Sequence, residues 1–265
     1  MIPVEVVEGD GPVILGLPHT GTWLPDAIRD RLNDRGRLLA DTDWHVERLY
    51  AGLLPGATTV RATFHRYVID ANRGPDDASL YPGQNTTGLV PLTDFDGEPI
   101  WNDAPGAAEI SARTDRFHAR YHAALAGEVA RVKARHGVAI LYDCHSIRSR
   151  IPFLFEGTLP DFNIGTNNGT TCDPRIEEAT RARCAATGRT MAVNGRFKGG
   201  WTTRHYGRPE TGVHAIQMEL AQSTHLAAEE PPFAYDAAKA AALRETLRDI
   251  LAALADLAPS LRRPA

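Results

Sequence analysis

Two histidines and a glutamate belong to apolar stretches of this chain, where ionisable side chains are costly unless they serve a purpose. His19 follows the apolar run from Pro12 to Leu17, His145 follows the run from Val138 to Tyr142, and Glu219 lies inside a third run. The ends of buried strands carry the chemistry of many α/β enzymes, and histidine and carboxylate are typical ligands of hydrolytic zinc sites. The sequence therefore predicts a metal-dependent hydrolase.

A further metal ligand is expected in the segment LLADTDWHVERLY, which holds Asp41, Asp43 and His45. Acidic residues are favoured in the first turn of a helix whatever the function, and this reason is sufficient for Asp41. Asp43 and His45 both remain as candidate ligands. We favour Asp43, because a carboxylate beside two histidines is the ligand set of zinc peptidases that leaves one position open for water.

Glu219 lies between Met218 and Leu220 on an expected core strand, where an unpaired carboxylate is unfavourable. It either forms an ion pair with a buried arginine or acts as a general base with a pKa raised by burial. We favour the general base, because carboxylates with shifted pKa values concentrate at functional sites. Asp143, two residues before His145, is expected to orient that imidazole.

Two polar clusters are candidates for binding an acidic substrate. The segment RYVIDANRG carries Arg66, Asn72 and Arg73, and a guanidinium beside an amide is suited to hold a small carboxylate. The ordinary alternative for each arginine is a surface salt bridge. The glycine-rich segment GRFKGGWTTRHYG carries Arg204 and His205, and its glycines permit close approach to a ligand.

The elements that must position these residues follow from the apolar patterns. Strands are expected at Pro12 to Leu17, Thr58 to Ala62, Tyr67 to Ile69, Val138 to Tyr142 and Val213 to Leu220. Helices are expected at Leu24 to Leu32, Trp44 to Leu53, Ala107 to Arg135, Pro174 to Ala186 and Ala237 to Leu257. This alternation predicts an α/β fold with a central mixed, mostly parallel sheet flanked by helices.

Two stretches are too long and too polar for ordinary connections. Residues 74–98 are rich in glycine, proline and asparagine, and we expect a functional lid or a small hairpin there. Residues 151–169 are expected to form a second such loop.

Length and composition favour one domain over residues 1–265, because 265 residues with 43% hydrophobic content form one substantial core. The net charge of −4 and the scattered basic residues argue against nucleic acid or an anionic membrane as a partner.

The start of the sequence has no pattern of a secretory signal, so we expect a cytoplasmic protein. The three cysteines lack a metal-binding spacing and are expected to be free thiols. The sequence does not indicate an oligomeric state.

The segments LPHTGTWLP, DTDWH, RYVIDANR, YPGQNTTGLVPLTDFDG, YDCHSIRS, NGRFKGGWTTRHYG and HAIQMELAQ together resemble the N-formylglutamate amidohydrolases, and the resemblance runs nearly end to end. It implies a zinc-dependent fold similar to the carboxypeptidase-type exopeptidases. It also implies that His19, Asp43 and His145 hold one Zn²⁺ and that Glu219 is the catalytic acid and base. Three residues after His19 stands Thr22, where the exopeptidases usually carry a glutamate ligand.

The resemblance implies a reaction that converts N-formyl-L-glutamate, a small-molecule substrate, to formate and glutamate at the end of histidine degradation. Asn72 and Arg73 then hold one substrate carboxylate, with Arg204 or Arg66 for the other. The alternatives are a hydrolase of another N-acyl amino acid or peptide, and a metal-free protein that binds acidic amino acids. Glu219 argues against the binding protein, because a buried carboxylate repels a dianion.

Overall fold

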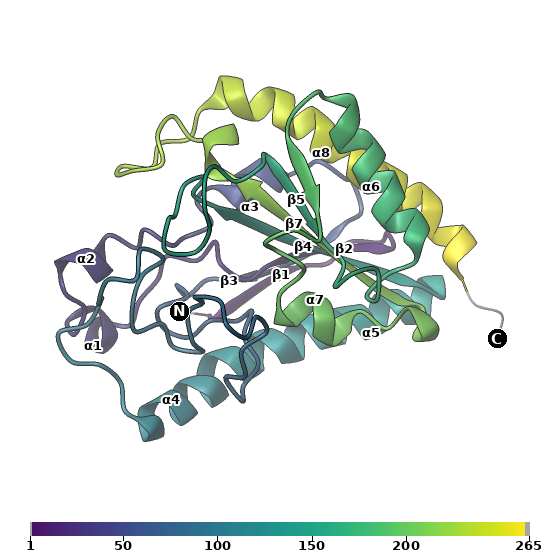
Figure 1. Ribbon diagram of the computed structural model, residues 1–265. Coiled ribbons are helices and arrows are strands. Elements are labelled where there is room, and N and C mark those ends of the chain that lie inside the picture. Colours follow the sequence, from purple (N-terminus) through teal and green to yellow (C-terminus); the bar gives the residue numbers. More distant parts are fainter. Residues whose placement is uncertain (1, 263–265) are drawn as a thin grey trace.

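The computed structural model describes residues 2–262, and a single sheet forms the centre of the molecule (Figure 1). Its strands in this range are β1 (Val4–Val7), β2 (Val13–Leu17), β3 (Thr58–Ala62), β4 (Ala139–Ile147), β5 (Phe162–Gly165), β6 (Met191–Val193) and β7 (Val213–Ala221). They lie in the order β1-β3-β2-β4-β7-β5-β6. Strands β3, β2, β4 and β7 are parallel neighbours, as are β5 and β6, whereas β1 pairs antiparallel with β3 and β5 with β7. The expected mixed, mostly parallel sheet is confirmed.

Helices cover both faces of this sheet (Figure 1). The α-helices are α1 (Asp26–Arg29), α2 (Asp34–Arg37), α3 (Val46–Tyr50), α4 (Ala107–Arg113), α5 (Ala119–His136), α6 (Pro174–Ala186), α7 (Trp201–Tyr206) and α8 (Ala237–Leu257). The short helices are the π-helix η1 (Thr114–His118) and the 3-10 helices η2 (Pro209–Thr211), η3 (Gln222–Thr224) and η4 (Ala258–Leu261). Helices α3, α6 and α8 lie on one face, and α4, α5 and α7 on the other. This arrangement is a single α/β domain.

The central strands are buried on both faces, which explains their nearly continuous apolar sequences. Every residue of β2, β4 and β7 is buried. Ile216 and Met218 of β7 pack with Leu247 of α8 in one apolar cluster, while Leu141 of β4 packs with Leu125 of α5 in the other. The three cysteines are buried and free, as expected. Polar side chains in these strands are therefore held in a rigid and largely dry setting.

Several expected elements differ from the structure. The run Tyr67 to Ile69 is buried but forms a turn, because the Val68 amide donates to the His65 carbonyl rather than to a strand. The loop expected at residues 151–169 contains β5, and β4 continues through Ile147, so that His145 lies within a strand.

The helices predicted at Leu24 to Leu32 and Trp44 to Leu53 are shorter in the structure, where they correspond to α1 and α3. Helix α3 begins late because His45 takes a left-handed conformation with φ of 62°. The predicted helix from Ala107 to Arg135 is present as α4, η1 and α5, with a π-helical segment in its interior. It ends at His136, and Gly137 with φ of 72° forms its glycine C-cap.

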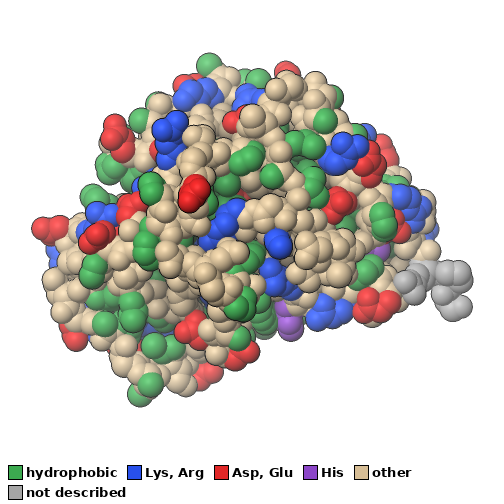
Figure 2. All heavy atoms as spheres, in the orientation of Figure 1, with side chains coloured by type: hydrophobic (Ala, Val, Ile, Leu, Met, Phe, Trp, Pro, Cys, Tyr) green, Lys and Arg blue, Asp and Glu red, His purple; other side chains and the backbone are tan. Residues whose placement is uncertain are grey.

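Acidic and basic side chains are interspersed over the face drawn in Figure 2. Within residues 2–262, no helix is long and apolar enough to cross a membrane.

Candidate metal centre and active-site cavity

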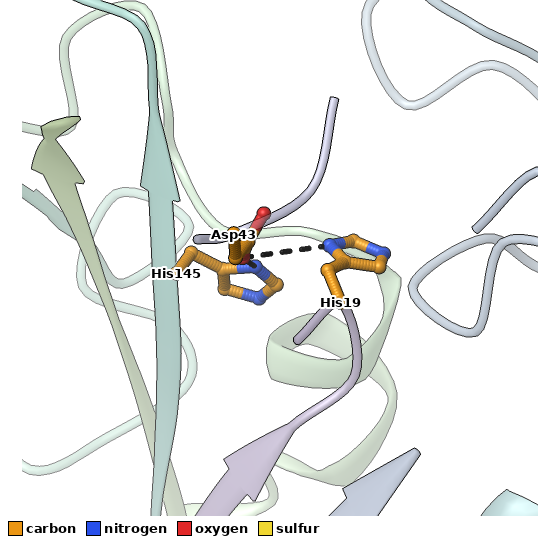
Figure 3. Close-up of side chains that lie close together, drawn as sticks. All are labelled: His19, Asp43 and His145. Atoms are coloured by element: carbon orange, nitrogen blue, oxygen red, sulfur yellow. Dashed lines mark hydrogen bonds and ion pairs between the residues drawn. The ribbon is translucent and has the colours of Figure 1, made fainter. Parts of the chain in front are cut away.

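Three side chains from separate parts of the sequence meet beside the carboxyl ends of β2 and β4 (Figure 3). His19, Asp43 and His145 each offer one ligand atom, and these atoms all lie within 4.8 Å of one another. Asp43 Oδ2 lies 3.0 Å from His145 Nδ1 and 3.8 Å from His19 Nδ1. All three residues are buried. The structure thus brings together the three residues that the sequence pointed to as ligands.

The backbone fixes this group. His19 stands two residues beyond β2, and its carbonyl accepts a hydrogen bond of 3.1 Å from the Asp43 amide. The Ser146 amide, on β4, donates to Asp43 Oδ2 at 3.2 Å. The loop that carries Asp43 is therefore tied to both strands that carry the histidines.

Each imidazole has a second carboxylate on its far side. His19 Nε2 lies 2.7 Å from Asp70 Oδ1, and His145 Nε2 lies 3.2 Å from Asp143 Oδ1. Asp143 therefore lies within ion-pair distance of the His145 ring, and its orienting role stays a prediction. At His19, the Asp70 carboxylate accepts from Nε2 and keeps the proton there, so that Nδ1 presents its lone pair toward Asp43.

The charges around the three ligand atoms favour a cation. Burial opposes protonation of His145, yet the carboxylates of Asp143 and Asp43 raise its pKa well above the ordinary value. Two nitrogen ligands and one carboxylate ligand, backed by carboxylates, match the donors of a hydrolytic zinc site. The residues present therefore fit a divalent metal ion.

The remaining candidates near Asp43 lie outside this group. His45 Nε2 bonds the Phe233 carbonyl at 2.9 Å, and the His45 ring contacts Tyr235. Asp41 Oδ2 accepts from the Tyr67 hydroxyl at 2.8 Å and from the Phe95 amide at 3.0 Å. The choice between Asp43 and His45 is therefore made by geometry in favour of Asp43.

Glu219 lies on β7 directly opposite His145 on β4. Its Oε2 accepts a hydrogen bond of 3.1 Å from Gln217 Nε2, while Gln217 Oε1 accepts one of 2.7 Å from the Gly200 amide. The second bond fixes the orientation of the Gln217 amide, so its NH₂ group must face Glu219. Burial raises the pKa of Glu219, an effect that the positive charge of His145 opposes.

These groups open into one cavity of about 90 Å³, with space for several water-sized groups and hence for a small molecule. The loop 74–98 supplies much of its wall, together with residues near 154 and 196. From that loop come Leu80, Tyr81, Asn85, Thr86, Thr87 and Phe95.

Asn72 and Arg73 line the cavity and are held from behind by two histidines. His122 Nε2 bonds the Ala71 carbonyl and His118 Nε2 bonds the Arg73 carbonyl, each at 2.8 Å. From α7, the Thr202 amide donates to Asn72 Oδ1 at 2.8 Å. The Asn72 amide nitrogen lies 3.1 Å from His145 Nε2, so this segment borders the metal ligands.

The other three residues expected to bind substrate lie in different surroundings. Arg66 lines the cavity, but its Nη2 lies 2.5 Å from Asp70 Oδ2. Arg204 and His205 are not among the residues that line this cavity: Arg204 bonds the Gly199 carbonyl at 2.9 Å, and the His205 ring stacks on Trp201. Helix α7 carries both side chains away from the cavity.

Three residues of the site had no assigned function in the sequence analysis. Gln217 could have been found, because it precedes Glu219 by two residues on a strand and must share its face. Asp70 and Arg196 gave no comparable signal, since both lie in loops whose path the apolar pattern does not define.

Comparison with known proteins extends over most of the chain. Residues 11–226 match the family model described as N-formylglutamate amidohydrolase. An N-formylglutamate deformylase of Pseudomonas aeruginosa is 49% identical over 252 residues, which cover 93% of this chain and 94% of that protein. One of Pseudomonas putida is 46% identical over 93% of each chain. The crystal structure of an N-formylglutamate amidohydrolase from Ralstonia eutropha has a TM-score of 0.84 at 26% identity, and covers 98% of this chain and 99% of that one.

Proposed function

Because this chain belongs to the N-formylglutamate amidohydrolase family, we propose that it hydrolyses N-formyl-L-glutamate to formate and L-glutamate with the help of a divalent metal ion. In cells this reaction would complete the degradation of histidine. The observation that carries the metal dependence is the buried group of His19, Asp43 and His145, with a further carboxylate behind each imidazole. Zn²⁺ is the ion that this donor set suits best.

His19, Asp43 and His145 would hold the ion. When bound, a zinc ion supplies Lewis acidity, which polarises the carbonyl group of an amide and makes water more acidic. Asp70 orients the His19 imidazole and keeps its Nε2 protonated, and Asp143 lies 3.2 Å from Nε2 of the His145 imidazole.

Glu219 moves the proton. Its Oε2 is occupied by the hydrogen bond from Gln217, which leaves Oε1 to take a proton from the attacking water. The same atom then delivers that proton to the amine nitrogen of the departing glutamate. The buried setting, which raises the pKa of Glu219, makes the carboxyl group basic enough for both steps.

Asn72 and Arg73 would bind the α-carboxylate of the substrate. Burial lowers the pKa of Arg73, and among residues 2–262 its guanidinium has no carboxylate within ion-pair distance. A half-buried cation without an ion-pair partner is unfavourable, and a bound carboxylate would compensate it.

The test combines metal analysis with formate release. The purified protein should contain about one equivalent of zinc or a similar divalent ion, and should release formate from N-formyl-L-glutamate. His145→Ala should lose both, whereas His45→Ala, which changes a nearby histidine outside the ligand group, should keep the metal. A His145→Ala protein with full metal content and full turnover would refute the assignment.

A further inference from the structure

Three arginines border the cavity, and they differ in whether their charge is already balanced. Arg66 lies 2.5 Å from Asp70 and 4.0 Å from Asp43, so its guanidinium is paired. Arg73 and Arg196 have no acidic partner within ion-pair distance in the described part of the chain. The cavity thus presents two arginines without an ion-pair partner to a molecule that enters it.

Arg196 is held firmly despite lacking an acidic partner. Its Nε donates to the Leu154 carbonyl and its Nη2 to the Asn85 carbonyl, each at 3.0 Å. The guanidinium carbon lies 5.3 Å from the Tyr81 ring centre and 5.2 Å from that of Phe197. A guanidinium has five N–H donors, so three remain for a ligand once these two bonds are formed.

The surroundings of Arg196 make an anion favourable there. Burial lowers the pKa of Arg196, and Tyr81 and the carboxylate of Glu219 oppose this effect only in part. An arriving carboxylate would relieve the effect of burial and would form the paired contact that a guanidinium provides. Because Arg73 adjoins Asn72 and the metal ligands, it suits the carboxylate nearer the scissile amide, which leaves Arg196 for the other one.

We propose that Arg196 binds the side-chain carboxylate of the substrate and thereby determines the preference for N-formylated dicarboxylic amino acids. This inference rests on the proposed hydrolytic function. It replaces Arg66 and Arg204 as the partner of the second carboxylate. Since Arg196 bridges the loops that carry Asn85 and Leu154, the contact with substrate also joins two walls of the cavity.

Arg204 provides a matched control. Its guanidinium lies 5.0 Å from the centre of the same Tyr81 ring and bonds backbone carbonyls, those of Gly199 and Leu80. It does not line the cavity. Replacing Arg204 therefore removes a charge of the same type from the same neighbourhood without removing a ligand of the substrate.

The experiment measures kcat/KM for N-formyl-L-glutamate and for N-formyl-L-glutamine with the metal-loaded protein. Wild type should prefer the glutamate derivative. Arg196→Gln should lower kcat/KM for that substrate by about ten- to a hundredfold, which is the cost of a lost hydrogen bond to a charged group. The value of kcat/KM for N-formyl-L-glutamine should change little. Arg204→Gln should keep the preference. Arg196→Lys, which keeps the charge but not the forked contact, should show an intermediate preference.

The outcomes separate the two proposals. If Arg196→Gln lowers kcat/KM equally for both substrates, or leaves the preference for N-formyl-L-glutamate intact, Arg196 does not bind the second carboxylate. If wild type hydrolyses both substrates equally well, the specificity inference is wrong and the hydrolytic function stands. If metal-loaded wild type releases no formate from either substrate, the proposed function itself is wrong. Because turnover of N-formyl-L-glutamine reports folding of each variant, a misfolded variant is distinguished from one that has lost specificity.

Discussion

Asp143 and His145 on β4 stand opposite Gln217 and Glu219 on β7, so four polar side chains share one face at the centre of the sheet. Their spacing of two residues in each strand is what places them together. The intervening Cys144 and Met218 face the apolar cluster on the other side. A slip of one strand by one residue would therefore turn its two polar side chains into that cluster.

The role of Glu219 is tested by Glu219→Gln. The amide has nearly the same shape but takes up no proton, so kcat should fall by about 10²- to 10⁴-fold. Metal content and unfolding midpoint should stay close to those of wild type, and both serve as controls. Near-normal turnover would assign Glu219 a structural role instead.

His122 should make stability depend on pH. Burial, aided by the nearby charge of His118, lowers the pKa of His122 to about 3 from the ordinary 6.5. Between these values the unfolded chain binds a proton that the folded chain does not, so stability falls as the pH is lowered through this window. His122→Gln removes this contribution. Its loss of unfolding free energy between pH 7 and pH 5 should be smaller than that of wild type by about 2 kcal/mol.

Urea unfolding at the two pH values measures this effect. The comparison at pH 7, where His122 is mostly neutral in both states, separates the packing cost of the substitution from its titration. If wild type and His122→Gln lost the same amount of unfolding free energy between pH 7 and pH 5, the prediction would be contradicted.

Among the elements, α5 and α7 act on the site by clamping the segment that carries Asn72. His118 of η1 and His122 of α5 bond backbone carbonyls of this segment. The amide of Thr202, at the start of α7, donates to the Asn72 side chain. Gly200, just before α7, lies so close that an added Cβ would be 2.3 Å from Asn72 Nδ2. The segment thus has almost no freedom to move on the α7 side.

Gly200→Ala should displace the Asn72 side chain. A shift of about 1 Å in a group that positions substrate can lower kcat/KM by about a hundredfold. Gly127→Ala, within α5, is the matched control, because an added Cβ there meets nothing within 4 Å. Steady-state kinetics of both variants would show whether the close approach matters, and equal activity of the two would argue that Asn72 adapts without loss.

The elements also show why the sequence predicted some parts of the fold and missed others. Strands β2, β4 and β7 were identifiable because burial on both faces requires long apolar runs. Strands β5 and β6 have only four and three residues, too few to show a period. The buried turn at Tyr67 to Ile69 was mistaken for a strand because burial alone does not distinguish the two.

For the whole molecule, a bound metal should contribute to stability. Binding to the folded state alone stabilises by about 4 kcal/mol when free metal exceeds its Kd a thousandfold, which corresponds to about 10 °C in Tm. Removing the ion with a chelator should lower Tm by a comparable amount, and adding Zn²⁺ should restore it. Calorimetry of His145→Ala gives the reference, since chelator should leave its Tm unchanged. An unchanged wild-type Tm after verified metal removal would contradict this expectation.

The residue types of the metal group were predictable, because His19, Asp43 and His145 adjoin recognisable strands or helices. The residues of the cavity wall were not predictable from the sequence. Arg196 and Arg204 stand eight residues apart in one glycine-rich segment, and only the path of the backbone sends one into the cavity and the other along α7. Glycines such as Gly199, with φ of 107°, allow that path without signalling its direction.

The order of strands in the sheet has a consequence for biosynthesis. Strand β7 is the last in the sequence, yet it lies between β4 and β5. A ribosome therefore releases all three metal ligands before it releases Glu219 and the strand that completes the centre of the sheet. We expect a competent metal site to form only after β7 has left the ribosome, because Glu219 and the strand that completes the centre of the sheet arrive with it.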